Sequence, residues 1–320
     1  MLDATNIRIL DRFDMNTGYR AVVQKGNVGS KYVYGLQLRN SQTETHVLRG
    51  YRGNVTTPVL TLVGAAAGHT QTWEFAGNHK DINGNSRAGQ WFVGTKNKNK
   101  WASQIARVDI RYKSYASSNT EFPRLAYLNR AGNPEDQCSG DEMERAEVAV
   151  SPDYSMLLIA TIENNETGHF SIYDLDVINN ALDEAGDNGF VNMGNYQCKT
   201  SFTVYGLYGS VLNSVQGYDL DNSGNIYITS QKSPSLSYGK WSAHHKEIVK
   251  IPFYARNDQS QWENVNLSAF GGLDISGEHS EVESIQIIDE NHGYLTVAYH
   301  ANVNGKNKTV SNKVYELAWD

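Results

Sequence analysis

The stretch from Gly68 to Asp81 brings together residue types that can hold a sugar. His69, Gln71 and Trp73 stand at alternate positions, so on a strand their side chains share one face. A flat indole can stack on the apolar face of a sugar ring while an amide and an imidazole hydrogen-bond its hydroxyls. A tryptophan packed in the core, with the histidine and glutamine pairing buried backbone groups, fits the same pattern. The sequence leaves both interpretations open.

Four polar residues stand close to strand-like apolar runs, at intervals of about 70 residues. They are Gln71, Glu144, Gln216 and Glu283. If each lies at the start of the innermost strand of a repeated sheet, the four side chains form a polar ring around a central axis, with His69 and His279 nearby. The mouth of such a channel is a common place for a ligand. A ring that only solvates the channel agrees equally with the spacing.

The sequence offers little that indicates catalysis. It has no serine nucleophile elbow, no phosphate-binding glycine loop and no HExxH helix. Glu144 and Glu283 lie on units that are not adjacent, and such a pair could act as acid and base on a glycosidic bond. That role requires one carboxyl group with a raised pKa, which a sequence does not show. Glycan cleavage is therefore the weakest of the functional alternatives.

Candidate metal ligands do not form a recognisable set. His69 and His79 lack a convincing third partner, and the acidic loop from Pro134 to Glu144 matches no defined calcium loop. Asp219 to Gly224 resembles the first half of an EF-hand loop, but the twelfth position is Ser230 rather than glutamate. We therefore predict hairpin turns and a solvated loop, with no metal and no cofactor.

The chain has two cysteines, Cys138 and Cys198, on either side of the third repeat unit. Neither belongs to a CxxC pair, so structural zinc is not expected. A disulfide between them and two separate thiols are equally compatible with their positions.

Short strands in repeated groups must position these residues. Residues 214–229 have the pattern of a strand, a turn and a second strand, and residues 247–253 provide a third. Similar groups occur at residues 70–110, 143–175 and 280–319, and a weaker one lies near the N-terminus. Five units of roughly 60–70 residues fill the chain. We therefore predict an all-β, five-bladed β-propeller that forms a single domain over residues 1–320, with paired β-sandwiches as the alternative.

The pattern also predicts where individual units begin and end. Residues 1–50 are expected to hold the first unit, with residues 17–24 as a strand, and residues 51–64 to lead into the second. Residues 174–182 are expected to form one or two helical turns, and the lysine-rich run at 96–100 to be a hairpin tip.

Composition excludes several classes of protein. Apolar residues make up 39% of the chain and charged residues 20%, which is typical of a folded domain with a sizeable core. The net charge of −7 and the lack of a basic stripe argue against nucleic-acid binding. No apolar run approaches the roughly 20 residues needed to span a membrane. The N-terminus lacks the layout of a signal peptide, which leaves open a cytoplasmic protein or an exported one whose leader is absent or unconventional.

Part of the sequence resembles a known family. The segments GHTQTWEF, WFVGTK (Trp91 to Lys96) and W-x-x-QIARV (Trp101 to Val108) are similar to those of the helveticin J family, the large, heat-labile bacteriocins of lactobacilli. The resemblance is clearest from Gly64 to Ile110, and the length and later strand pattern agree with it along nearly the whole chain. It implies a secreted or cell-surface-associated antibacterial protein. It assigns no catalytic motif.

Three functional hypotheses remain. The first is a bacteriocin that acts on related bacteria, without enzymatic chemistry, by recognising a cell-envelope glycan or a surface receptor. The second is a carbohydrate-binding surface protein that does not kill. The third is a glycan-cleaving enzyme. In the first two, the candidate ligand-binding residues are His69, Gln71, Trp73, Glu144, Gln216, His279 and Glu283 at the mouth of the central channel.

Overall fold

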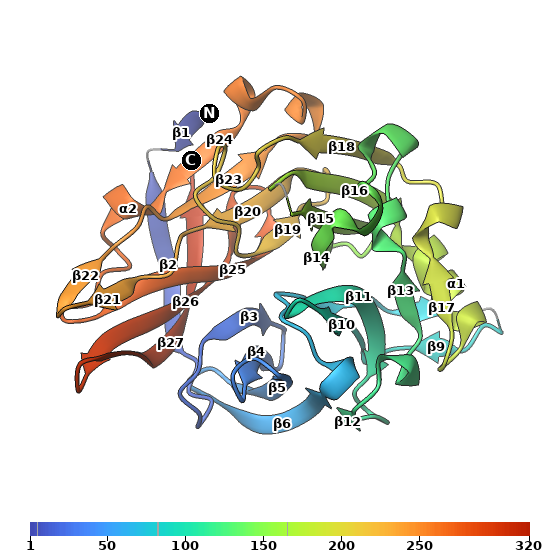
Figure 1. The fold of residues 1–320 in the computed structure, drawn as a ribbon, viewed down its shortest axis with the longest axis horizontal. Coiled ribbons are helices and arrows are strands. Elements are labelled where there is room, and N and C mark those ends of the chain that lie inside the picture. Colours follow the sequence, from blue (N-terminus) through green and yellow to red (C-terminus); the bar gives the residue numbers. More distant parts are fainter. Residues whose placement is uncertain (5, 82, 165) are drawn as a thin grey trace.

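Five β-sheets surround a central axis in the computed structural model of the chain (Figure 1), which describes residues 1–4, 6–81, 83–164 and 166–320. Each sheet has four or five strands, mostly antiparallel. The innermost strand of each sheet contacts the innermost strand of the next, and the fifth contacts the first. The chain is therefore a five-bladed β-propeller, as predicted.

The first two blades follow the chain in order. Blade one comprises β3 (Val23–Val28), β4 (Val33–Arg39), β5 (Glu44–Tyr51) and β6 (Asn54–Val63), with β12 (Tyr115–Ala116) added parallel to β6. Blade two comprises β7 (Trp73–Phe75), β10 (Gln90–Lys98), β11 (Trp101–Asp109) and β13 (Arg124–Ala126), with β17 (Phe190–Asn192) parallel to β13. A small hairpin of β8 (His79–Lys80) and β9 (Ser86–Arg87) lies between β7 and β10.

Blades three and four continue the ring. Blade three comprises β14 (Met143–Val150), β15 (Met156–Glu163), β16 (Gly168–Asp174) and β18 (Thr200–Val204). Blade four comprises β19 (Tyr218–Leu220), β20 (Ile226–Ser230), β23 (Glu247–Ile251) and β24 (Glu263–Asn266), with β1 (Leu2–Ala4) parallel to β24. The loop after β20 forms the hairpin of β21 (Ser235–Ser237) and β22 (Lys240–Ser242).

Blade five closes the ring with both ends of the chain. It comprises β25 (His279–Asp289), β26 (His292–Val303) and β27 (Lys306–Trp319), and its outermost strand is β2 (Ile7–Asp14). β2 pairs antiparallel with β27, so the N-terminal segment completes the sheet built by the C-terminal one.

A separate cluster of buried apolar side chains fills each of the five interfaces between blades. Neighbouring strand residues point to opposite faces, and both faces are covered. In blade two, Ile105 packs against blade three while its neighbour Ala106 packs against blade one. In blade three, Leu157 packs against blade two while Leu158 packs against blade four. A ring of blades explains why these strands are apolar on both faces, whereas two paired sandwiches would leave outer faces to water.

The predicted boundaries of the first unit are wrong. Residues 2–4 belong to blade four and residues 7–14 to blade five, and residues 17–22 form no strand, so blade one begins at Val23. Residues 54–63 are the outer strand of blade one rather than a lead into blade two. Alternation identifies a strand but does not say which sheet it joins, and here β2 pairs with a strand at the far end of the chain.

Helices are few and short. α1 (Leu175–Ala185) lies where a helical turn was predicted, and the Asp174 carboxylate caps it by accepting the N–H groups of Asp176 and Val177. α2 (Leu267–Phe270) is a single turn capped by Asn266. In the described parts of the chain, none of the helices is both long and apolar enough to span a bilayer.

Candidate functional site

One polar side chain from each blade meets at the axis of the propeller. These five are Gln24, Gln71, Arg145, Gln216 and Glu283. The Gln71 amide is the centre of the group, because its Nε2 donates to Gln216 Oε1 at 2.9 Å and its Oε1 accepts from Arg145 at 2.7 Å. Gln24 and Glu283 also interact with Gln71. Three of the predicted ring residues, Gln71, Gln216 and Glu283, are therefore brought together.

Blade three contributes Arg145 rather than the predicted Glu144. The pairing of β14 with β15 shifts register between Met143 and Arg145, which is an irregularity of the β-bulge type. A one-residue shift exchanges the two faces of a strand. No feature of the residue pattern indicates this shift, and the pattern does not indicate Gln24 either, because blade one begins later in the chain than the predicted first unit.

A cavity of about 310 Å³ lies at the end of the channel where the inner strands begin, and we call it the entry cavity. Its lining residues come from blades two, three and four and from the loops beside them. They are His69, Trp101, Glu144, Arg145, Ile162, Tyr208, Ser214, Val215, Gln216 and Ser233. Of the predicted ligand-binding residues, His69, Glu144 and Gln216 line this cavity.

Trp101 is the aromatic platform of the entry cavity. The imidazole of His69 stacks on it with ring centroids 4.0 Å apart, and the guanidinium of Arg145 lies 4.0 Å from the centre of its ring. Burial, together with the positive charge of Arg145, lowers the pKa of His69 to about 3. His69 is therefore neutral at physiological pH, and Arg145 carries the positive charge of this group.

Two predicted binding residues lie elsewhere. Trp73 is fully buried in the core between blades one and two, where it stacks on Trp91 with ring centroids 4.8 Å apart. Strand β7 begins only at Trp73, so the expected alternation with His69 and Gln71 does not hold. His279 stacks on Trp241 of the β21–β22 hairpin and is not part of the cavity wall.

Further buried ionisable groups lie around the axis beside the ring. The Nζ of Lys25 lies 2.6 Å from a carboxylate oxygen of Glu74, and both side chains are almost completely buried. Burial raises the pKa of Asp219 and of Glu283 well above the usual range, because a buried carboxylate loses its hydration. Glu147 accepts hydrogen bonds from both Thr70 and Thr72. These contacts join blades one, two, three and four around the axis.

A second cavity, of about 710 Å³, lies at the opposite end of the channel. Aromatic side chains contribute much of its wall, among them Tyr32, Phe75, Trp91 and Tyr154. Sequence reasoning did not identify it, because its residues come from the inner strands of all five blades, from the second strands β4, β10 and β26, and from loops between strands.

The predicted carboxylate pair is not assembled in the entry cavity. Glu144 is the one carboxylate among the described residues that line this cavity. Glu283 is only 2% exposed and lies outside that lining. A glycosidase places both carboxyl groups beside the bond that it cleaves.

The two cysteines do not form a disulfide. Cys138 and Cys198 are both buried and free, and burial raises the pKa of the Cys138 thiol to about 11.

The aspartate-rich segment from Asp219 to Gly224 contains a turn held by one side chain. The Asp221 carboxylate accepts the backbone N–H groups of Ser223 and Asn225. The half EF-hand pattern is therefore a hairpin turn, as predicted.

Comparison with known proteins finds one family model and one characterised protein that match nearly the whole chain. A family model described as "Bacteriocin helveticin-J" matches residues 3–320. Bacteriocin helveticin-J of Lactobacillus helveticus is 61% identical over 334 residues, and the match covers 99% of this chain and 98% of that protein.

Similar solved structures share much less sequence. A tail fiber of Staphylococcus aureus phage P68 matches with a TM-score of 0.53 at 14% identity, over 97% of this chain. The match spans 52% of that tail fiber chain, and at this identity it indicates a shared fold alone. The β-propeller domain of the Trilobed protease from Pyrococcus furiosus matches more weakly, with a TM-score of 0.36 at 11% identity over 92% of this chain and 86% of that chain.

Proposed function

The chain belongs to the helveticin-J bacteriocin family, and on that basis we propose that it is a secreted or cell-surface-associated protein that acts on related bacteria by recognising a glycan of their envelope. The 61% identity over nearly the full length of both chains is the observation that carries the bacteriocin role. Recognition, rather than bond cleavage, is the step that we assign to the propeller.

The chemistry of the entry cavity supports a glycan ligand. Its volume of about 310 Å³ lies at the lower end of the range of ligand pockets. The wall offers the aromatic ring of Tyr208 beside the amide of Gln216 and the guanidinium of Arg145, while the ring of Trp101 holds His69 and Arg145 in place. Aromatic surface beside planar hydrogen-bonding groups suits a molecule with apolar ring faces and a hydroxylated edge.

The alternatives have weaker support. Glycan cleavage requires a second carboxyl group beside the bond, and Glu144 stands alone among the described lining residues. A surface protein that binds the same glycan without killing would use the same cavity, so only a biological assay separates it from a bacteriocin.

The experiment compares two tyrosines of one loop. Tyr208 lines the entry cavity, whereas Tyr205 is 78% exposed and does not. The purified chain and the variants Tyr208→Ala and Tyr205→Ala are assayed for binding to isolated cell walls of several lactobacilli and for inhibition of their growth. We expect Tyr208→Ala to weaken wall binding by about tenfold, equivalent to about 1.4 kcal/mol, and to reduce killing in parallel. Tyr205→Ala should retain both.

Other outcomes would redirect the proposal. Wall binding without growth inhibition would indicate a carbohydrate-binding surface protein. Loss of binding in Tyr154→Ala, but not in Tyr208→Ala, would move recognition to the opposite cavity. Release of sugar from the walls that Glu144→Gln abolishes would indicate an enzyme and overturn the recognition role.

A further inference from the structure

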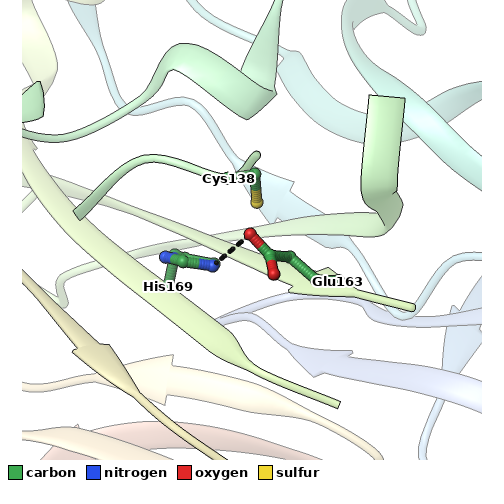
Figure 2. A group of neighbouring side chains, drawn as sticks. All are labelled: Cys138, Glu163 and His169. Atoms are coloured by element: carbon green, nitrogen blue, oxygen red, sulfur yellow. Dashed lines mark ion pairs between the residues drawn. The ribbon is translucent and has the colours of Figure 1, made fainter. Parts of the chain in front are cut away.

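Three potential metal ligands meet in the outer part of blade three. Cys138 belongs to the loop that precedes β14, Glu163 ends β15, and His169 lies at the start of β16 (Figure 2). Their ligand atoms all lie within 4.8 Å of one another. The three residues are 7%, 4% and 7% exposed, so the group is buried and already assembled.

The hydrogen bonds of His169 leave its Nε2 atom directed toward Glu163 and Cys138. Its Nδ1 lies 2.7 Å from the carbonyl oxygen of Asp136. A carbonyl oxygen only accepts, so Nδ1 carries a proton and donates it. In a neutral imidazole the lone pair then sits on Nε2. That arrangement, with Nδ1–H on a backbone carbonyl and Nε2 free to ligate, is the usual one for a metal-binding histidine.

The Nε2 atom faces an acceptor rather than a donor. It lies 3.0 Å from a carboxylate oxygen of Glu163, yet it makes no hydrogen bond of acceptable geometry within the described structure. The same oxygen of Glu163 already accepts the backbone N–H of Ser139 at 2.8 Å. Two lone pairs at this separation repel each other unless a cation lies between them, and that cation is either a proton or a metal ion.

We propose that Cys138, Glu163 and His169 bind one divalent transition-metal ion of the zinc type. A thiolate, an imidazole and a carboxylate together form a donor set that suits Zn²⁺, with a fourth position left for water. Tetrahedral zinc holds its ligand atoms about 3.3–3.7 Å apart, so the observed group requires only small side-chain movements.

The site would join the loop before β14 to the β15–β16 hairpin. Asp136 lies in that loop and already contacts blade three, because its carbonyl oxygen accepts from His169 of β16 and its carboxylate accepts the hydroxyls of two β18 residues, Ser201 at 2.6 Å and Thr203 at 3.2 Å. The loop continues directly into Glu144 and Arg145 of the entry cavity. A bound ion would therefore fix the segment that supplies this wall. No zinc spacing exists in the sequence, because only the fold brings residues 138, 163 and 169 together.

Cobalt is the direct probe of such a site. The full chain is treated with a chelator, and Co²⁺ is added while the absorption spectrum is recorded. We expect one Co²⁺ per chain, intense visible bands typical of tetrahedral cobalt, a thiolate charge-transfer band in the near ultraviolet, and displacement of both by Zn²⁺. Cys138→Ser should abolish the charge-transfer band, and His169→Gln should weaken binding at least tenfold.

Matched variants separate ligation from general destabilisation. Cys198→Ser removes the other buried thiol, which contacts Asn133 and lies outside the group. His300→Gln disturbs another buried His–Glu pair, formed with Glu281, that is not part of the group. Both variants should keep the full cobalt spectrum. As a second measurement, zinc should raise the thermal midpoint of the unmodified chain but not that of Cys138→Ser.

Two results would overturn the proposal. If the unmodified chain binds neither ion at micromolar concentration, a proton bridges His169 and Glu163 and the group is only an ion pair. If Cys198→Ser loses the charge-transfer band while Cys138→Ser keeps it, the thiolate ligand is misassigned.

Discussion

At the scale of single residues, the axis of the propeller concentrates ionisable groups away from water. Burial by itself lowers the pKa of Lys25, but the negative charges of Glu74 and Asp219 outweigh it and raise the pKa. Lys25 therefore stays charged, and burial raises the pKa of both carboxyl groups that it faces, that of Asp219 well above its usual range. The removal of one member of such a buried pair typically costs 3–5 kcal/mol, about half the stability of a typical domain.

Glu283 allows a test of this electrostatic arrangement. Burial and the charge of Glu281 raise its pKa well above the ordinary 4.5, so the folded chain binds a proton that the unfolded chain releases as the pH rises. The stability contributed by this group is complete below 4.5 and is lost as the pH increases through the raised pKa. Gln lacks this titration. We therefore expect Glu283→Gln to gain stability relative to the unmodified chain between about pH 4.5 and pH 7.

The measurement is urea-induced unfolding of both proteins across that pH range. His69→Gln should show the opposite pH dependence of the difference in unfolding free energy. The pKa of His69 is lowered from 6.5 to about 3, so its stability contribution is present above 6.5 and is lost as the pH falls. A difference in unfolding free energy between Glu283→Gln and the unmodified chain that stays constant with pH would show that Glu283 is not held neutral by burial.

At the scale of elements, most strands could be predicted, although the one expected at residues 17–24 begins only at Val23. The turn at Asp221 to Gly224 and the tip of the β10–β11 hairpin lie where turn residues interrupt alternating runs. Pairing partners could not be predicted, because alternation carries no information about which distant strand lies alongside. The shift at Met143 and Arg145 shows the same limit within one strand, since a local irregularity changed which of two adjacent side chains faces the axis.

The Asp221 turn predicts a large loss of stability from one substitution. The carboxylate is 2% exposed and accepts hydrogen bonds from Ser223, from Asn225 and from the hydroxyl of Tyr227. Asp221→Ala would leave the buried N–H of Asn225 and the buried hydroxyl of Tyr227 unpaired, so we expect it to lower the unfolding free energy by about 2–4 kcal/mol. Chemical denaturation checks this value.

Asp153 provides the matched control for that turn. It occupies the corresponding turn of blade three and accepts from Ser151 and Ser155, but it is exposed. Water can replace these bonds, so Asp153→Ala should cost about 1 kcal/mol or less. Equal losses for the two variants would mean that burial of the turn does not determine its contribution.

At the scale of the whole molecule, the repeat predicted the ring and most of what lies at its axis. Gln71, Gln216 and Glu283 meet there because each blade brings the start of its inner strand to the same place. The wall of the entry cavity could not be predicted in the same way. Trp101 reaches it from the start of β11, the third strand of blade two, and Tyr208 from the loop between β18 and β19, so neither follows the period.

The N-terminal strand β2 closes the ring by pairing with β27. β2 covers β27, whose Val314, Tyr315, Leu317 and Trp319 are at most 1% exposed. A chain without residues 1–14 would leave β27 as an open edge, which loses its hydrogen bonds and invites pairing with other molecules. We expect this truncation to lower the thermal midpoint strongly, to expose β27 to trypsin at Lys313, and to promote association in size-exclusion chromatography.

A chain without residues 1–4 is the control for this truncation. It loses only β1, a three-residue parallel strand at the edge of blade four, and keeps β2 in place. Its thermal midpoint should stay close to that of the full chain, because the ring remains closed. If the longer truncation is equally stable and monomeric, the interfaces between blades hold the ring without its closing strand, and the stability of this propeller resides in the five apolar clusters rather than in the joined termini.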